Sequence, residues 1–373
     1  KMKNSILFLS LFLLASCAKP IKITVENPLD FDRNGEIVEV ATAGLPAGFA
    51  DKSYVLKDAQ GQEVAYQLLS DKQTLIFPAH VPANASATYT LTEGTPAPAP
   101  VRAHVRFVPE RSDDMSWEND IAAYRMYGAA LEKIENPSNG VDIWMKYKDE
   151  PVMDSIYTGR LERNLPYHED CGLGGLDCYD VKHTLGAGGI APYTSKMWVG
   201  DAFDRYEIVE SGPLRSVFTL YYDTIPVEGG YYAETLTITS DAGSPLNKGV
   251  VKYEGADRPM QLATGIFMHG DSANTVFDKE NRIISYTKNA FSNKGVAQGQ
   301  TYIGVYAPAL TGEPFVEDKN YAVLNNYNVG DEFTYYFGGG WSKWKFPTEQ
   351  DWLTALAHFS QAQQNPLKVN VNQ

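Results

Sequence analysis

The chain has 373 residues, which is enough for one large domain or two ordinary ones. Its formal net charge is -14, and this excess of acidic residues argues against nucleic acid or an anionic membrane surface as a partner. Aromatic residues make up 12% of the chain, a content that suits either β-sheet packing or the stacking of sugars, so composition leaves both open.

Residues 1–17 are typical of a bacterial lipoprotein signal peptide. Lys1 and Lys3 precede an apolar run from Ile6 to Ala15, and Cys17 closes the string Leu-Ala-Ser-Cys. The run is shorter than the roughly 20 residues that cross a bilayer as a helix. We therefore expect Cys17 to be lipidated and the mature protein to be periplasmic, held to the outer membrane through its lipid alone. The oligomeric state is left open.

Residues 18–95 have the pattern of a small β-sandwich. Apolar and polar residues alternate from Ile21 to Val25, and a turn at Asn27-Pro28 follows. Similar short apolar stretches recur up to Leu91. Residues 96–100 read Pro-Ala-Pro-Ala-Pro and have no apolar period, which predicts a linker.

Strand patterns resume at residue 101 and continue almost to the C-terminus. The stretch Val101–Phe107 alternates strictly, and residues 215–227 and 231–240 predict a hairpin around Gly229-Gly230. So many strands without intervening helices predict an all-β fold, in which residues 101–373 form a large antiparallel sandwich.

One helix is predicted, close to the C-terminus. Thr348 is a suitable N-cap with Asp351 three residues on, and Asn365-Pro366 would end the helix. Its apolar face would consist of Trp352, Leu356 and Phe359.

The stretch from Asp113 to Asp120 contains four acidic residues. A solvated loop is the simplest interpretation, and a calcium site is an alternative, although the spacing matches no EF-hand. If a strand follows, Arg125 and Tyr127 point to the same face. Arg125 could then pair with Glu118 or Asp120, or bind a substrate carboxylate through both of its terminal nitrogens.

Tyr167 and His168 open a glycine-rich segment that contains Cys171 and Cys178. A disulfide between these cysteines would persist in an oxidising compartment, and two free thiols are the alternative. His168 is a candidate general base. The segment lacks the tight ligand pairs of zinc sites, so we expect no metal or other cofactor, with calcium or zinc as minor alternatives.

Two further stretches combine glycine with chemically useful side chains. His269 ends an apolar strand before Gly270, where it could meet a ligand or serve as a structural histidine. Gly338–Gly340 precede Trp341 and Lys343, which could present an aromatic platform and a cation, or form a tight turn with a packing tryptophan. No nucleophile elbow, zinc-protease helix or kinase motif occurs, which disfavours those enzyme classes.

Several of these stretches together resemble a known family, designated domain of unknown function 4861. They are Trp117–Asp120, Arg125–Gly128, Tyr167-His168, Leu185–Gly189 and Gly340–Lys343. The resemblance covers most of residues 19–365 and is most specific over residues 113–131. Members are typically lipoproteins or secreted proteins of Bacteroidetes, encoded among polysaccharide-utilisation genes. The resemblance implies a galactose-mutarotase-like β-supersandwich for the second domain.

The same resemblance implies an oligosaccharide dehydratase or lyase that acts on uronic acids. β-Elimination from a uronate needs a cation at the carboxylate, a base for the C5 proton and an acid for the group that leaves C4. Arg125 or Lys343 would be the cation, and Tyr167 the acid. His168 or His269 would be the base. Stabilising the enolate would contribute about 3 to 4 kcal/mol per well-placed group. The candidate substrate contacts are Trp117, Glu118, Asp120, Tyr127 and Trp341.

Three other functions remain open at this point. A glycoside hydrolase would use Glu118 and Asp120 as paired acids, although two residues so close in sequence rarely flank a substrate. A non-catalytic sugar-binding protein would use Trp117 and Trp341 as platforms. A sugar mutarotase would fit the expected fold and use the same histidines. In each case the partner is an oligosaccharide or sugar.

Overall fold

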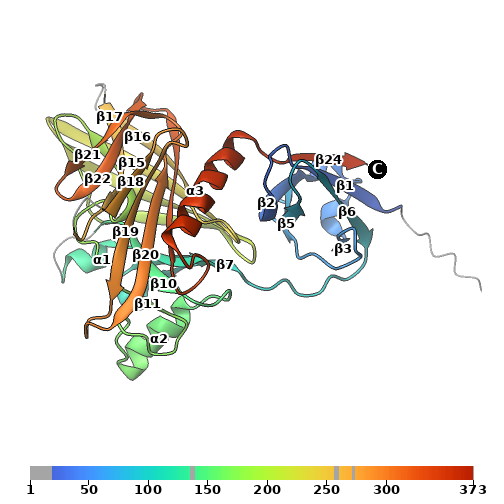
Figure 1. The fold of residues 1–373 in the computed structure, drawn as a ribbon, viewed down its shortest axis with the longest axis horizontal. Coiled ribbons are helices and arrows are strands. Elements are labelled where there is room, and N and C mark those ends of the chain that lie inside the picture. The colour runs from blue at the N-terminus through green and yellow to red at the C-terminus, as the bar shows by residue number, and fades with distance from the viewer. Residues whose placement is uncertain (1–18, 135–138, 256–259, 271–273, 373) are drawn as a thin grey trace, which may run out of the picture.

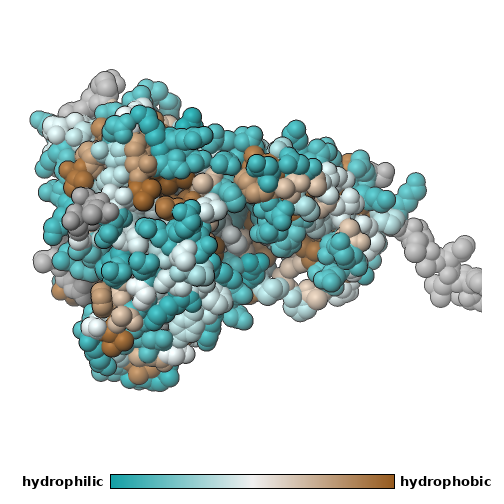
Figure 2. Space-filling model, in the orientation of Figure 1, coloured by the Kyte–Doolittle hydropathy of each residue, from teal (hydrophilic) through white to brown (hydrophobic). Residues whose placement is uncertain are grey.

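The computed structural model describes residues 19–134, 139–255, 260–270 and 274–372. Cys17 lies outside these residues, so its lipidation stays a prediction. Within the described part of the chain, no helix is both long and apolar enough to cross a membrane. Hydrophilic residues cover most of the face shown in Figure 2, and hydrophobic ones lie in scattered patches.

The fold consists almost entirely of antiparallel strands, arranged in a small and a large unit (Figure 1). The small unit packs a four-stranded sheet, in the order β24-β1-β6-β3, against a three-stranded sheet, β2-β5-β4. Its core is built from the alternating apolar residues that the sequence shows, such as Ile21, Ile23 and Val25 of β1. The strands are β1 (Ile21–Glu26), β2 (Arg33–Ala41), β3 (Tyr54–Lys57), β4 (Gln67–Leu68), β5 (Thr74–Val81) and β6 (Ser86–Glu93).

The last strand of the chain, β24 (Lys368–Asn372), belongs to the small unit. It pairs with β1 in a register that runs from Lys22 opposite Asn372 to Glu26 opposite Lys368. Figure 1 shows β24 beside β1, with the C-terminus at the far end of the small unit. The expected second domain, residues 101–373, is therefore too long by this strand. These five residues belong to the small unit because they pair with β1 at the other end of the chain, and no local sequence pattern shows such a pairing.

In the part of the large unit that the structure describes, the strands form three antiparallel sheets. Their orders are β11-β10-β9-β8-β7, β12-β17-β22-β21 and β13-β14-β15-β16-β23-β20-β19-β18. The predicted all-β fold, with a small sandwich, a large antiparallel supersandwich and few helices, is confirmed. The strands of the first sheet are β7 (Ala103–Val108), β8 (Asp114–Asn119), β9 (Ala122–Met126), β10 (Asp142–Lys146) and β11 (Gly175–Asp177).

The other two sheets supply most of the remaining strands, and the hairpin expected around Gly229-Gly230 is formed by β14 and β15. The four-stranded sheet contains β12 (Ala187–Tyr193), β17 (Met260–Phe267), β21 (Leu310–Glu317) and β22 (Asn320–Tyr327). The eight-stranded sheet contains β13 (Arg205–Ser211), β14 (Arg215–Val227), β15 (Gly230–Asp241), β16 (Asn247–Gly255), β18 (Thr275–Asp278), β19 (Ile283–Phe291), β20 (Ala297–Tyr306) and β23 (Glu332–Trp341).

Residues Asp114–Asn119 of the acidic stretch form a buried strand, so the interpretation as a solvated loop is wrong. Every residue of β8 is buried. Met115 and Trp117 point into the main core, where the Trp117 ring stacks on Tyr124 at 5.3 Å. The alternate residues, including Asp114 and Glu118, therefore face the opposite side of the sheet.

That opposite side is covered by helix α2 (Met153–Arg163), which the sequence pattern did not predict. The helix contains Gly159 and has no side-chain N-cap on its preceding residue. Its first amide groups are instead held by a distant strand, since the carboxylate of Glu118 accepts hydrogen bonds from the backbone of Val152 and Met153 at 2.8 to 3.0 Å. Another helix, α1 (Ala129–Glu132), is a single turn.

The C-terminal helix forms as predicted, as α3 (Glu349–Gln364). Thr348 and Asp351 make a reciprocal capping box, and Trp352 and Leu356 are fully buried against the large unit. Figure 1 shows α3 between the two units. The glycines Gly338–Gly340 lie in β23 and not in a turn. A side chain at Gly340 would collide with Phe346.

Replacing Thr348 with alanine should lower the free energy of unfolding by about 1 kcal/mol, because the side-chain cap of α3 is lost. Urea denaturation would measure the change. Gln350→Ala, in the same turn, is a control that leaves both capping bonds in place and removes only an exposed bond to Thr354. Equal stability of the Thr348 and Gln350 variants would contradict the assigned role of the cap.

Candidate functional site

A buried arginine organises the outer face of the five-stranded sheet. Arg125 of β9 is 4% exposed, and its Nη2 lies 2.6 Å from Oδ2 of Asp142 on β10. Its Nη1 lies 3.4 Å from Oδ2 of Asp114 on β8, and its Nη2 lies 4.0 Å from Oδ2 of Asp177 on β11. Four neighbouring strands therefore contribute one ionisable side chain each to a single cluster.

Burial raises the pKa of two of these carboxyl groups. Burial raises the pKa of Asp114 to about 6, although the Arg125 charge opposes the shift. Burial and the carboxylate of Asp142 raise the pKa of Asp177 well above its ordinary value. The positive charge of Arg125 is already compensated by its neighbours. Its expected role as the cation for a substrate carboxylate is therefore contradicted.

Tyr127 is also enclosed in this cluster. Its hydroxyl accepts a bond of 3.3 Å from Nη2 of Arg125, whose guanidinium lies 4.8 Å from the centre of the tyrosine ring. As predicted, the two side chains share one face of their strand. Because Tyr127 is only 8% exposed, its expected role as a substrate contact is contradicted as well.

Tyr167 and His168 lie where the arginine cluster meets the surface. The Tyr167 ring stacks on Trp144 of β10, with centres 5.0 Å apart, and lies 4.4 Å from the His168 ring. Nη2 of Arg111 donates to the Tyr167 hydroxyl at 3.3 Å. Arg111 was not predicted as a site residue, because its proximity depends on packing between residues 56 positions apart in the chain.

His168 and Asp177 form a dyad. Nδ1 of His168 lies 3.3 Å from both the backbone oxygen and Oδ2 of Asp177. Nε2 has no hydrogen-bond partner among the described residues, and the side chain is 37% exposed. Burial lowers the pKa of His168, which favours the neutral ring. A neutral imidazole that is held at Nδ1 and free at Nε2 can act as a base.

His269 is arranged differently. Its Nε2 is hydrogen-bonded to the backbone oxygen of Asp180, and its Nδ1 is buried without a partner among the described residues. Tyr179 and Phe267 pack edge-on against its ring. Burial lowers its pKa to about 4. With both nitrogens directed into the protein, His269 is the weaker candidate for the base.

Trp341 and Lys343 do not form the expected exposed platform. Trp341 is 1% exposed, and its Nε1 donates to the backbone oxygen of Gln298. Lys343 is exposed, and its Nζ donates to Oε1 of Gln298 at 2.7 Å. The structure therefore contradicts the role of Trp341 in stacking a sugar, and it does not bring Lys343 into contact with His168.

Trp117, Glu118 and Asp120 are also interior residues, which contradicts their expected roles as substrate contacts or paired hydrolytic acids. Glu118 forms a buried ion pair of 2.8 Å with Lys146. Asp120 pairs with Arg102 and accepts a hydrogen bond from the backbone of Gly243. Each carboxylate is occupied in holding separate parts of the fold together.

Cys171 and Cys178 are both free, so the disulfide considered from the sequence is not formed. Sγ of Cys178 is buried and lies 3.8 Å from Oγ1 of Thr301, whereas Sγ of Cys171 contacts the backbone oxygen of Pro166. Among the described residues, no three histidine, cysteine or acidic side chains are grouped so that they could hold a metal ion.

Among the cavities that lie away from these residues, one lies between the two units. It has a volume of about 340 Å³ and is lined by residues that include Phe31, Arg33 and His358. Arg33 is already paired with Glu36, and the Phe31 and His358 rings stack on each other. The cavity contains none of the residues expected from the sequence.

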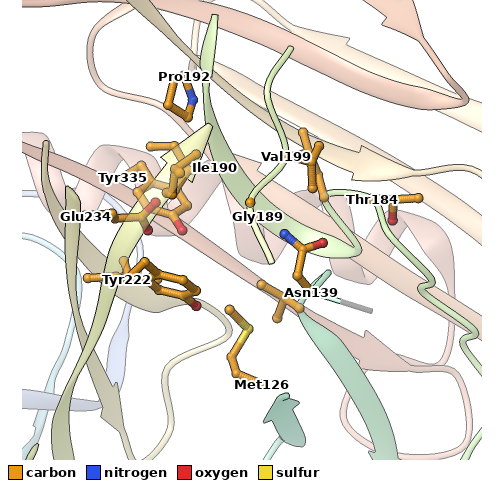
Figure 3. A pocket seen from close by; sticks show the side chains of 15 residues that line it. Met126, Asn139, Thr184, Gly189, Ile190, Pro192, Val199, Tyr222, Glu234 and Tyr335 are labelled. Atoms are coloured by element: carbon orange, nitrogen blue, oxygen red, sulfur yellow. The ribbon is translucent and has the colours of Figure 1, made fainter. Parts of the chain in front are cut away.

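The second cavity is a small one inside the large unit. Glu234, Tyr222 and Tyr335 lie on one side of it and Asn139 on the other (Figure 3). Its volume of about 30 Å³ accommodates one or two water molecules and no sugar. Burial raises the pKa of Glu234 to about 8. An acidic residue at an inward position of an alternating strand is the sequence signal that could have identified this site.

Replacing Glu234 with glutamine should remove a pH dependence of stability. In the wild type, the unfolded chain ionises Glu234 near its ordinary pKa while the folded protein keeps the proton up to about pH 8, so stability falls as the pH rises between these values. Relative to the variant, wild-type protein should lose about 2 to 3 kcal/mol between about pH 5 and pH 7. Urea denaturation at both pH values would measure this loss. Glu332→Gln, at an exposed position, is the control, and parallel pH profiles for wild type and Glu234→Gln would disprove the assignment.

The fold and the polar cluster define an all-β protein with an enclosed arginine–carboxylate network that opens at a histidine dyad. The chain belongs to the family described as Domain of unknown function (DUF4861), whose model matches residues 25–369. It is 26% identical over 388 residues to "Uncharacterized protein P7" of Formosa agariphila, an alignment that covers 96% of both chains.

Solved structures show the same fold at low sequence identity. An α-mannosidase from Enterococcus faecalis V583 superposes with a TM-score of 0.51 at 10% identity, over 95% of this chain and 46% of the other. A glycosyl hydrolase family 38 protein from Enterococcus faecalis gives a TM-score of 0.53 at 10% identity, with 95% and 47% covered. This chain therefore spans slightly less than half the length of either neighbour, and the similarity is one of fold alone.

Proposed function

We propose that this protein is a carbohydrate-active enzyme that acts on oligosaccharides containing uronic acids by β-elimination. The observation that carries the proposal is the partly exposed His168–Asp177 dyad, whose histidine ring lies against Tyr167, the residue that Arg111 contacts. The shared fold with an α-mannosidase and a family 38 glycosyl hydrolase is consistent with a sugar substrate, although fold alone does not determine chemistry.

Arg111 replaces Arg125 as the residue that would bind the substrate carboxylate. It is half-buried, forms no ion pair with a carboxylate among the described residues, and contacts the Tyr167 hydroxyl. Arg160 lies on the same ring, with its guanidinium 5.9 Å from the centre of Tyr167. A group of guanidinium side chains at the surface of an acidic protein suits an anionic sugar.

In this mechanism, Arg111 binds the uronate carboxylate and stabilises the enolate that develops when the C5 proton leaves. Nε2 of His168 accepts that proton, while the backbone oxygen of Asp177, 3.3 Å from Nδ1, holds the proton on Nδ1. The C4–O bond breaks as the electron pair of the C5–H bond forms the C4=C5 double bond. Tyr167 donates its hydroxyl proton to the departing oxygen, and the neighbouring Arg111 stabilises the tyrosinate.

Ultraviolet absorbance tests the proposal, because a C4=C5 double bond conjugated with a carboxylate absorbs where the substrate does not. Purified protein would be incubated with oligosaccharides that end in a uronic acid, and binding would be followed in parallel by calorimetry. New absorbance supports elimination. Binding of the same oligosaccharides without new absorbance would reject the lyase and favour a non-catalytic sugar-binding protein.

A further inference from the structure

Lys288 is placed beside the histidine dyad by the eight-stranded sheet. It lies on β19 opposite Thr301 of β20, which in turn lies opposite Trp341 of β23. Directly opposed residues of antiparallel strands share a face, so the three side chains form one row. Nζ of Lys288 donates to the backbone oxygen of Cys178 at 2.9 Å, and Cys178 directly follows Asp177 of the dyad.

Lys288 has no carboxylate within ion-pair distance among the described residues, although Asp177 and Asp180 act on it electrostatically. Lys288 is half-buried, and it forms no ion pair within 4.0 Å of a carboxylate in the described chain. Because the ammonium group is partly removed from water, burial lowers its pKa. The fully buried Lys146, by contrast, is paired with Glu118 at 2.8 Å. A partly desolvated cation without an acidic partner is stabilised when an anion binds to it.

The short segment from Asp177 to Asp180 contacts Lys288 and both candidate histidines. His168 is held by Asp177, Lys288 by the oxygen of Cys178, and His269 by the oxygen of Asp180. Three extended residues span about 10 Å, so the segment is short enough for one oligosaccharide to lie along it. The Asp180 carboxylate acts electrostatically on both His168 and Lys288, and it is itself exposed and paired with Lys182 at 3.5 Å.

We propose that Lys288 binds the carboxylate of a second uronic acid in an oligosaccharide whose first uronic acid lies at His168. This inference rests on the proposed function and narrows the substrate class to oligosaccharides with at least two uronic acids. His269, enclosed beside Lys288, serves as a wall of this second position and not as a base.

Isothermal titration calorimetry would compare a di-uronate oligosaccharide with the same sugar in which the second carboxyl group has been reduced to an alcohol. We expect wild-type protein to bind the di-uronate about tenfold more tightly, because a hydrogen bond to a charged group is lost in the reduced sugar. Lys288→Gln should abolish this preference and Lys288→Arg should keep it. Lys182→Gln, which removes an exposed lysine, is the matched control and should also keep it.

Equal wild-type affinity for the two sugars, binding of neither, or a preference that survives in Lys288→Gln would each overturn the inference. The wild-type comparison and Lys288→Arg keep the test decisive if Lys288→Gln does not fold. A preference that depends on Lys288 but is accompanied by no new ultraviolet absorbance would reject the proposed elimination and retain the second uronate position.

Discussion

Replacing His168 with alanine should lower the rate of double-bond formation by at least about 100-fold, within the range that a general base contributes. Binding affinity should change far less, because the carboxylate contact at Arg111 remains. The rate would be followed by ultraviolet absorbance and the affinity by calorimetry. His183→Ala is a matched control, since His183 is also exposed and also lies near a carboxylate, with Nε2 3.5 Å from Asp201.

The pH profile gives this experiment a second readout. A base must be neutral to accept a proton, so activity should fall as the pH drops through the pKa of His168. Burial places this pKa below the ordinary value of 6.5, and activity should therefore persist at mildly acidic pH. Asp177→Asn should move this acidic limb without abolishing binding. Full activity of His168→Ala would remove His168 from the mechanism and leave His269 as the remaining histidine of the site.

Replacing Arg125 with methionine should lower the free energy of unfolding by about 3 to 5 kcal/mol. The substitution leaves Asp142, Asp114 and Asp177 buried without the cation that they share. Urea denaturation at neutral pH would measure the loss. The loss should shrink as the pH falls, because protonation of the carboxyl groups removes the uncompensated charges.

An exposed arginine provides the comparison for this experiment. Arg205 pairs with Asp223 at 2.7 Å, nearly the distance between Arg125 and Asp142, but both members of this pair are more than half exposed. Arg205→Met should therefore cost less than about 1 kcal/mol. If the two variants were equally stable, the Arg125 cluster would not be the structural centre that its burial indicates.

The sequence was most informative where local pattern determines structure. Alternation in residues 215–240 predicted the β14–β15 hairpin, and the spacing of Thr348 and Asp351 predicted the start of α3. These features depend on neighbours in the chain, whose geometry is fixed by the two-residue repeat of a strand and by the capping of a helix. Helix α2 was not predicted, because its N-terminus is capped by Glu118, which lies 34 residues away in the chain.

For the candidate site, the sequence identified the residues that are adjacent in the chain. Tyr167 and His168 were found together, and Arg125 and Tyr127 were correctly placed on one face. The sequence could not show which of them are structural and which could contact a substrate, because the burial of a charged residue is not visible in the sequence. Arg125 is enclosed by acids from three other strands, whereas Arg111 and Lys288, which the sequence did not select, remain without an acidic partner among the described residues.

By itself, the sequence determined an all-β chain with two sandwich units, one capped helix and a short set of histidine, tyrosine and arginine candidates. Only the tertiary structure decided which of these side chains meet and which are buried. It showed that β8 of the acidic stretch is a buried strand, that β24 pairs within the small unit, and that His168 lies against Asp177. The physical reason is that strand pairing and ion pairing act between residues far apart in the chain, whose proximity no local pattern records.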